Sequence, residues 1–142
     1  MTIAPGEFKS AWRGDELLAR DDWLHEFTTA ELAELDRAIA NVGAQGREIE
    51  SLAATDLPLA GTSINARLAE IQRNLEHGSG ACLLKGLQIE SRSEDACRRL
   101  FWAIATQLGT PVSQSAAGER IFSVRDEGFK IGPPPRATAQ ER

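Results

Sequence analysis

Apolar side chains recur at helical spacing in three stretches of the chain, and each stretch carries its own start signal. The most sharply bounded stretch runs from Ser93 to Gly109, where one stripe contains Cys97, Leu100, Phe101, Ile104 and Leu108. Positions spaced i, i+3, i+4, i+7 and i+11 share one helix face, so this face is expected to be buried. Ser93 can cap the first turn, Gly109 can adopt a left-handed exit conformation, and Pro111 prevents continuation.

A second helix is predicted to begin after Thr28. Thr28 and Glu31 have the spacing of a capping box, in which each side chain bonds the backbone of the other residue. Phe27 and Leu32 occupy the two positions of a hydrophobic staple, which fixes how the chain enters a helix. Apolar residues then continue at helical spacing, and Gly43 is expected to end the helix.

A third helix is predicted over residues 64–77, with Thr62 or Ser63 as its cap and Gly78 as its end. His77 lies in the last turn of this helix. An imidazolium there would complement the negative end of the helix dipole, and this structural role is favoured over a catalytic one.

The segments between these helices are expected to be mostly irregular. The connector 43–63 is predicted to contain a short helical turn near residues 47–52 and to dock residues 57–59 in an extended conformation. Residues 15–20 can form a turn or two of helix. They are followed by bulky side chains that are expected to cover a core, not to bind a ligand: Trp23, Leu24 and Phe27.

Two short apolar runs flank the helix at 93–109 and predict strands. The first, residues 81–84, lies between Gly80 and Gly86, and the second covers residues 119–124. Together with the helix they predict a strand, helix, strand unit. The tail at 129–142 contains three consecutive prolines and no apolar period, so it is expected to be extended.

The composition is that of one ordinary globular domain. The 142 residues carry a net charge of -5, and no basic cluster exceeds Arg98-Arg99, so no nucleic-acid partner is expected. The sequence contains no signal-peptide pattern and no long apolar window, which predicts a cytoplasmic chain without a membrane partner. Cys82 and Cys97 fit reduced core thiols better than a disulfide.

Several segments, in this order along the chain, resemble the N-terminal portion of the TauD/TfdA-like oxygenase family: 80–87 (GACLLKGL), 100–102 (LFW), 108–114 (LGTPVSQ) and 124–128 (VRDEG). The resemblance implies an α+β fold, with a helical N-terminal region and the first strands of a clavaminate-synthase-like double-stranded β-helix, an incomplete jelly roll. It assigns residues 1–128 to the N-terminal portion of an oxygenase domain and residues 129–142 to a proline-rich extended tail.

The resemblance also implies Fe(II)/2-oxoglutarate-dependent dioxygenase chemistry on a small-molecule substrate. Such enzymes hold iron with two histidines and one carboxylate, as His-x-Asp or His-x-Glu plus a distant histidine. This sequence contains only His25 and His77, with Phe27 and Ser79 two positions later. The chain is therefore expected to be truncated before the iron-binding motif, to hold no metal, catalytic residue or cofactor, and to be inactive alone.

One loop is predicted to contact substrate. In related enzymes the residues that match Gln114 and Ser115 commonly read Gln-Asn and lie near the substrate, and Ser115 departs from that pattern. The alternative is a polar loop that hydrogen-bonds its own backbone. The adjacent acidic residues Asp21-Asp22 and Asp126-Glu127 fit a solvated surface better than an acid-base pair.

Two other functions remain open. The chain can be a non-catalytic interaction module, whose partner is a second copy or a complementary chain that carries the missing strands. This hypothesis predicts an exposed apolar patch where the absent sheet would lie. The chain can also be a structured remnant without activity, which the sequence does not distinguish from an interaction module.

Overall fold

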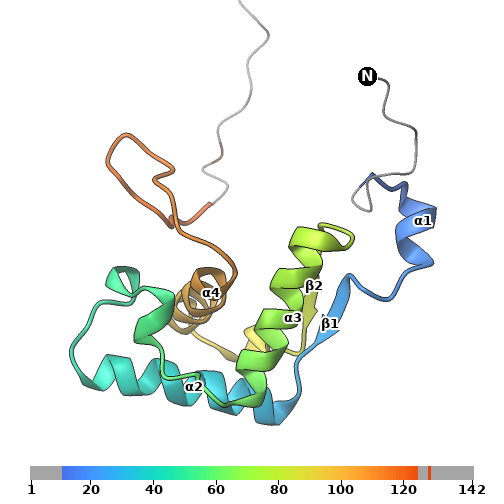
Figure 1. Ribbon diagram of the computed structural model, residues 1–142. Helices are drawn as coiled ribbons and strands as arrows, with labels where there is room; N and C mark the ends of the chain where they lie inside the picture. The colour runs from blue at the N-terminus through green and yellow to red at the C-terminus, as the bar shows by residue number, and fades with distance from the viewer. Residues whose placement is uncertain (1–10, 125–127, 129–142) are drawn as a thin grey trace, which may run out of the picture. The chain divides into compact units, whose positions relative to one another are not determined.

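Residues 11–124 and 128 are described in the computed structural model. The chain divides into two compact units, residues 1–112 and 113–142. The described residues of the first unit form an α+β structure with six helices and strands: α1 (Gly14–Leu18), β1 (Leu24–Glu26), α2 (Thr29–Ala44), α3 (Ser63–His77), β2 (Leu83–Lys85) and α4 (Glu94–Leu108) (Figure 1). Short 3-10 turns occur at Ile49–Ser51, Ala54–Asp56 and Ile89–Ser91. The predicted tail at 129–142 lies outside the described residues.

The three predicted helices are confirmed, and their caps form as expected. The Thr28 hydroxyl accepts a hydrogen bond from the Glu31 backbone, while the Glu31 carboxylate accepts one from the Thr28 backbone at 2.8 Å. Thr62 caps α3 and Ser93 caps α4 in the same way, each through its hydroxyl oxygen. These bonds satisfy backbone N–H groups that a helix leaves without partners, so each start is fixed locally.

The predicted helix ends are less accurate than the starts. Gly43 lies within α2, which ends at Ala44. Gly109 ends α4 with φ of -173° and Gly78 ends α3 with φ of -106°, so Gly109 does not adopt the left-handed conformation that was expected. Pro111 is sufficient to stop the helix, so a left-handed glycine is not needed at its end. The chain therefore leaves α4 in an extended conformation at Gly109.

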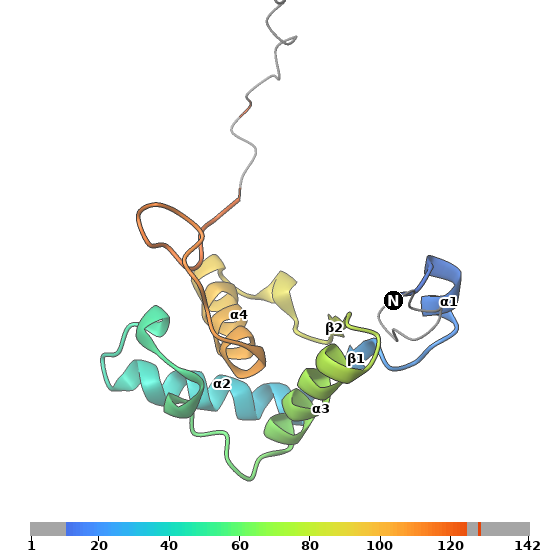
Figure 2. The same cartoon turned by 45° about the horizontal axis from the view of Figure 1, so that its top comes forward.

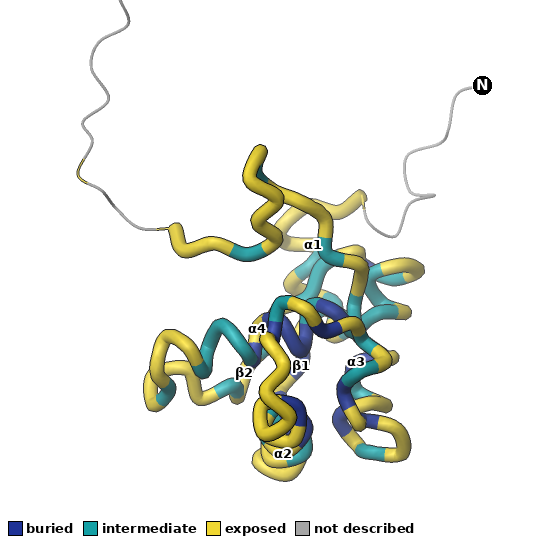
Figure 3. Tube along the Cα trace, turned by 90° about the vertical axis from the view of Figure 1, so that its left-hand side faces the viewer, coloured by how far each residue is buried: buried dark blue, intermediate teal, exposed yellow. Residues whose placement is uncertain are grey.

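The core lies where α2, α3 and α4 pack against one another (Figure 2). Figure 3 shows the buried positions gathered on these helices and on the connector between α2 and α3. The connector contains its predicted helical turn, and Leu57 and Leu59 are buried in its docked segment. The core therefore consists of one apolar stripe from each helix, closed on one side by the connector: Leu35, Val42, Leu59, Ile64, Ile71, Trp102 and Ala103.

The buried face of α4 differs from the predicted one. Leu100 and Ile104 are buried as expected, but Phe101 is 61% exposed and its neighbour Trp102 is only 2% exposed. The Trp102 indole nitrogen donates a hydrogen bond to the Leu52 carbonyl, in the connector, at 3.2 Å. The connector thus packs against a side of α4 that periodicity alone assigns to solvent, and this contact moves the centre of the buried face toward Trp102.

The sheet consists of β1 and β2, which pair in parallel with Leu24 opposite Leu83 and Glu26 opposite Lys85. The predicted strand at 81–84 is therefore confirmed with a small shift, but its partner is β1, which the sequence analysis did not predict. The other predicted strand, residues 119–124, is wrong because these described residues form no strand. The run is apolar enough for a strand, but a strand also requires a continuous ladder of backbone hydrogen bonds with a neighbouring strand, and the sheet of the described residues contains only β1 and β2.

Glu31 links α2 to α3 and makes the stability of this unit depend on pH. It is 6% exposed, and its carboxylate accepts hydrogen bonds from Thr28 and, at 3.1 Å, from Arg67 of α3. Burial acts to raise the pKa of this carboxyl, but the bonds to Thr28 and Arg67 outweigh it and hold the pKa below the ordinary value of 4.5. The ionised form is thus the one that the folded state stabilises.

A Glu31→Gln variant is expected to lose about 1–2 kcal/mol of unfolding free energy at neutral pH. In the native protein this contribution is present above pH 4.5 and disappears as the pH falls through the lowered pKa. Urea unfolding of both proteins between neutral and acidic pH tests this, with the exposed Glu90→Gln as the control. A difference of the same size at both ends of the range would contradict it.

Candidate functional site

The loop that holds Gln114 and Ser115 belongs to the second unit. The Gln114 backbone N–H donates to the Glu119 carbonyl at 2.8 Å, and the Ser115 hydroxyl donates to the Glu119 carboxylate at 2.9 Å. Gly118 donates its N–H to the Ser115 carbonyl at 3.1 Å. The loop thus closes on itself, with Gln114 exposed and the Ser115 hydroxyl engaged within it. The substrate contact of these two residues stays a prediction.

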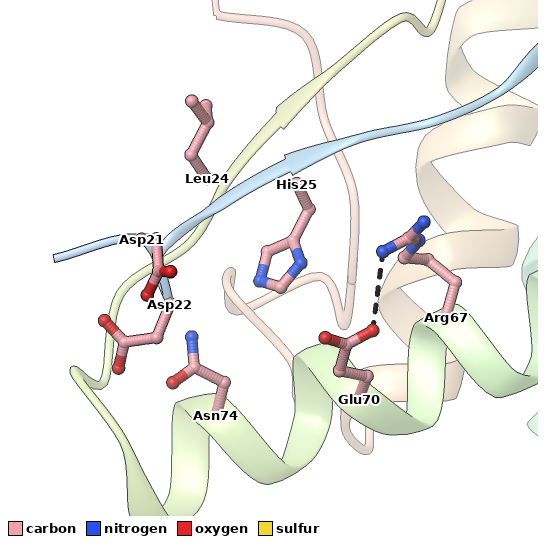
Figure 4. A pocket seen from close by; sticks show the side chains of 7 residues that line it. All are labelled: Asp21, Asp22, Leu24, His25, Arg67, Glu70 and Asn74. Atoms are coloured by element: carbon pink, nitrogen blue, oxygen red, sulfur yellow. Dashed lines mark hydrogen bonds and ion pairs between the residues drawn. The ribbon is translucent and has the colours of Figure 1, made fainter.

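A polar cleft of about 350 Å³ lies between the start of β1 and one face of α3 (Figure 4). Arg67, Glu70 and Asn74 follow one another at spacings of three and four residues, which places them on one side of α3. Strand alternation turns His25 inward, while Leu24 and Glu26 point outward. Asp21 and Asp22, just before β1, complete the lining.

Two polar atoms in this cleft are buried without a partner. His25 is 6% exposed, and its Nε2 atom makes no hydrogen bond, as is also true of Asn74 Nδ2. Figure 4 shows the His25 imidazole pointing from β1 toward α3, between Asn74 and Glu70. Buried polar atoms are nearly always paired, so two such atoms in one cleft mark it as a site for a polar ligand.

The charged side chains around the cleft differ in how far they are already paired. Arg20 contacts Asp22 at 2.9 and 2.6 Å, and the Ser79 N–H donates to Asp22 at 3.1 Å. The hydrogen bonds from Arg20 hold the pKa of Asp22 below its usual value despite partial burial. Arg67 contacts Glu31 at 3.1 Å and Glu70 at 3.4 Å. Asp21 makes no contact of this kind with another described residue.

An apolar groove of about 280 Å³ lies beside β2 and α4. Its lining includes Phe101, which is 61% exposed, and Ile89, which is 54% exposed. The outward face of the sheet is also apolar, with Leu24 and Leu83 adjacent and 43% and 47% exposed. Parallel sheets are normally covered on both faces, so this exposed apolar surface is unusual for a parallel pair.

The described residues do not fit a non-haem iron centre. Within residues 11–124, no three His, Cys, Asp or Glu side chains are arranged to hold a metal ion. The His25 side chain is buried on the inward face of β1, whereas the His77 side chain is exposed in the last turn of α3. Cys82 and Cys97 are free and half-buried, and burial raises the pKa of the Cys82 thiol, which disfavours the thiolate that binds metals.

Sequence reasoning missed His25 and Asn74 as site residues. The alternation of Trp23, His25 and Phe27 with Leu24 and Glu26 is the signal that could have predicted β1 and an inward-facing His25. Asn74 gives no such signal, because its place beside His25 depends on how α3 packs against the sheet.

No protein-family model matches this sequence. A stretch of 120 residues, 84% of the chain, is 27% identical to FR-33289 synthase of Streptomyces rubellomurinus (strain ATCC 31215). The chain is a distant relative of that synthase. The match covers 35% of the synthase, so this chain spans about a third of its relative's length. Among the residues that the structure describes, no helix has the length and hydropathy to cross a bilayer.

Proposed function

We propose that this chain forms the N-terminal, non-catalytic part of an Fe(II)/2-oxoglutarate-dependent oxygenase that hydroxylates a small molecule. The observation that carries the proposal is the match to FR-33289 synthase, which extends over 84% of this chain but only 35% of the synthase. The segments that resemble TauD/TfdA-like oxygenases lie within the same chain. Both observations support an enzyme in which other polypeptide, outside this chain, supplies the catalytic residues.

In this proposal, the iron ligands come from polypeptide outside these 142 residues, either continuous with them or separate. Two observations support this. No histidine follows His77 in the sequence, and the described residues contain no group of side chains suited to a metal. The family's chemistry is an oxidative hydroxylation that depends on bound iron and 2-oxoglutarate, and no residue of this chain is assigned to that step. Gln114 and Ser115 would line the substrate side of the completed pocket.

The exposed apolar surface is where the remaining polypeptide would pack. Leu24 and Leu83 on the open face of the sheet, and Phe101 and Ile89 in the groove, would all be covered by further strands of a double-stranded β-helix. Burying an aromatic side chain of this kind stabilises an interface by about 2 kcal/mol or more. The β1–β2 pair would then be one end of a larger sheet.

The proposal is tested by purifying this chain from its native cells through an affinity tag. Mass spectrometry then identifies any polypeptide that is covalently continuous with the chain or bound to it. The expected result is polypeptide that carries His-x-Asp or His-x-Glu followed by a distant histidine. Introducing Phe101→Asp is expected to remove a separate partner of this kind, while the matched exposed variant Leu18→Asp retains it. If the chain is recovered with no polypeptide that carries this histidine motif, either continuous with it or bound to it, the proposal is contradicted.

A second candidate is an interaction module without any oxygenase role, and the same apolar surface favours it. Its partner would be a second copy of this chain, packed through the open sheet face. Size-exclusion chromatography with light scattering discriminates between the two: the module predicts a stable dimer that Leu83→Asp dissociates. A monomer that melts cooperatively would exclude the self-association.

A further inference from the structure

The cleft between β1 and α3 contains an unusual pair of buried polar atoms. His25 Nε2 and Asn74 Nδ2 both lack a hydrogen-bond partner, and the His25 side chain is 6% exposed. Leaving a polar atom buried and unpaired costs about 1–3 kcal/mol. A ligand that bonds both atoms would recover that free energy, so the cleft is prepared for a molecule with two complementary polar groups.

The charge of the lining decides the sign of that molecule. Asp21, Asp22 and Glu70 provide three carboxylates against the single guanidinium of Arg67. Asp22 is already neutralised by Arg20, and Arg67 is shared between Glu70 and Glu31. Asp21 therefore retains a charge that no described side chain balances. A cation would be attracted to this cleft, and an anion would be repelled.

The hydrogen-bond inventory decides which cation fits. The Nε2 atom of a neutral imidazole can accept a bond, and carboxylates only accept, so these groups require a donor. The Asn74 Nδ2 group only donates and requires an oxygen acceptor. An ammonium group supplies three donors, and a hydroxyl or carbonyl oxygen beside it supplies the acceptor.

We infer that this cleft binds a small primary ammonium compound with a neighbouring hydroxyl or carbonyl oxygen, through His25, Asn74 and Asp21. The ammonium donates to His25 Nε2 and to the Asp21 carboxylate, and the oxygen accepts from Asn74 Nδ2. A cleft of about 350 Å³ has the size of a small-molecule pocket. The inference concerns the first unit alone and does not depend on the proposed oxygenase role.

Imidazole nitrogen spectra of the ¹⁵N-labelled chain, titrated with ethanolammonium chloride at neutral pH, test this directly. The chain has only two histidines, so the exposed His77 serves as an internal reference. The expected result is a saturable shift of the His25 Nε2 signal in the millimolar range, with His77 unchanged. Ethylammonium, which lacks the oxygen, ethylene glycol, which lacks the charge, and acetate are each expected to bind at least about tenfold more weakly.

Variants separate the two halves of the site. Asn74→Leu is expected to weaken the binding of ethanolammonium at least about tenfold while leaving the affinity for ethylammonium unchanged. Asp21→Asn, at an exposed position outside the helices and strands, is expected to weaken the binding of both compounds. Asp15→Asn, at another exposed position in α1, is expected to weaken the binding of neither. The inference is overturned if the His25 shift does not saturate, if His77 shifts equally, if ethylene glycol binds as tightly, or if Asp21→Asn leaves the affinity unchanged.

Discussion

Replacing Gly86 with alanine is expected to lower the free energy of unfolding by about 3 kcal/mol or more. Gly86 follows β2 with φ of +80°, a conformation that costs a side-chain-bearing residue about 1–2 kcal/mol. A Cβ atom at this position would also lie 2.5 Å from the Phe27 carbonyl oxygen. Because that oxygen belongs to the backbone just after β1, the strands must separate to admit the methyl group.

Two matched variants divide this effect into its parts. Gly61→Ala meets the same kind of backbone strain, with φ of +77°, but its Cβ would have no neighbour within 4 Å. It is expected to cost about 1–2 kcal/mol. Gly14→Ala has neither problem and is expected to be neutral or slightly stabilising. Urea unfolding of the three variants gives the values, and equal losses for Gly86→Ala and Gly61→Ala would show that the contact with Phe27 does not matter.

Replacing Trp102 with alanine is expected to cost about 3–5 kcal/mol, because it empties the centre of the first unit. Trp102 is 2% exposed, and its indole N–H donates to the Leu52 carbonyl. The variant leaves a cavity among α2, α3 and α4 and also leaves that carbonyl without its partner. For a unit of about 100 residues, a loss of this size lowers the melting temperature by more than about 12 °C.

The adjacent residue gives the control. Phe101 is also aromatic and lies on the same helix, but it is 61% exposed. Phe101→Ala is expected to change the free energy of unfolding by no more than about 0.5 kcal/mol. Thermal unfolding followed by circular dichroism compares the two variants. Equal destabilisation, or a greater effect at Phe101, would mean that α4 buries the face that its periodicity predicts.

These neighbouring residues show how far the sequence determines the fold. The helices and their starts are predictable, because a capping residue and an apolar stripe act within a few turns of one chain segment. Which side of α4 meets the connector is not predictable in this way, because the stripe and the docked segment are far apart in sequence. Periodicity therefore placed Phe101 inside, and the packing of Leu52 placed Trp102 there instead.

The strands and the site depend still more on tertiary contacts. β1 has only three residues and acquires its hydrogen bonds from β2, nearly sixty positions later. Residues 119–124 have a similar local pattern but join no sheet among the described residues, so the pattern alone was misleading. The polar cleft requires the β1–β2 pairing to turn His25 inward and α3 to present Asn74 to it. Neither position has a sequence motif, and only packing brings them together.

We propose that these 142 residues resemble part of an oxygenase and supply no ligand to its iron. Anaerobic titration of the purified chain with Fe(II) in the presence of 2-oxoglutarate, followed by an oxygen pulse and a succinate assay, tests this most directly. The account predicts neither stoichiometric iron binding nor succinate. One tightly bound iron per chain, or succinate formed in proportion to the chain, would contradict it.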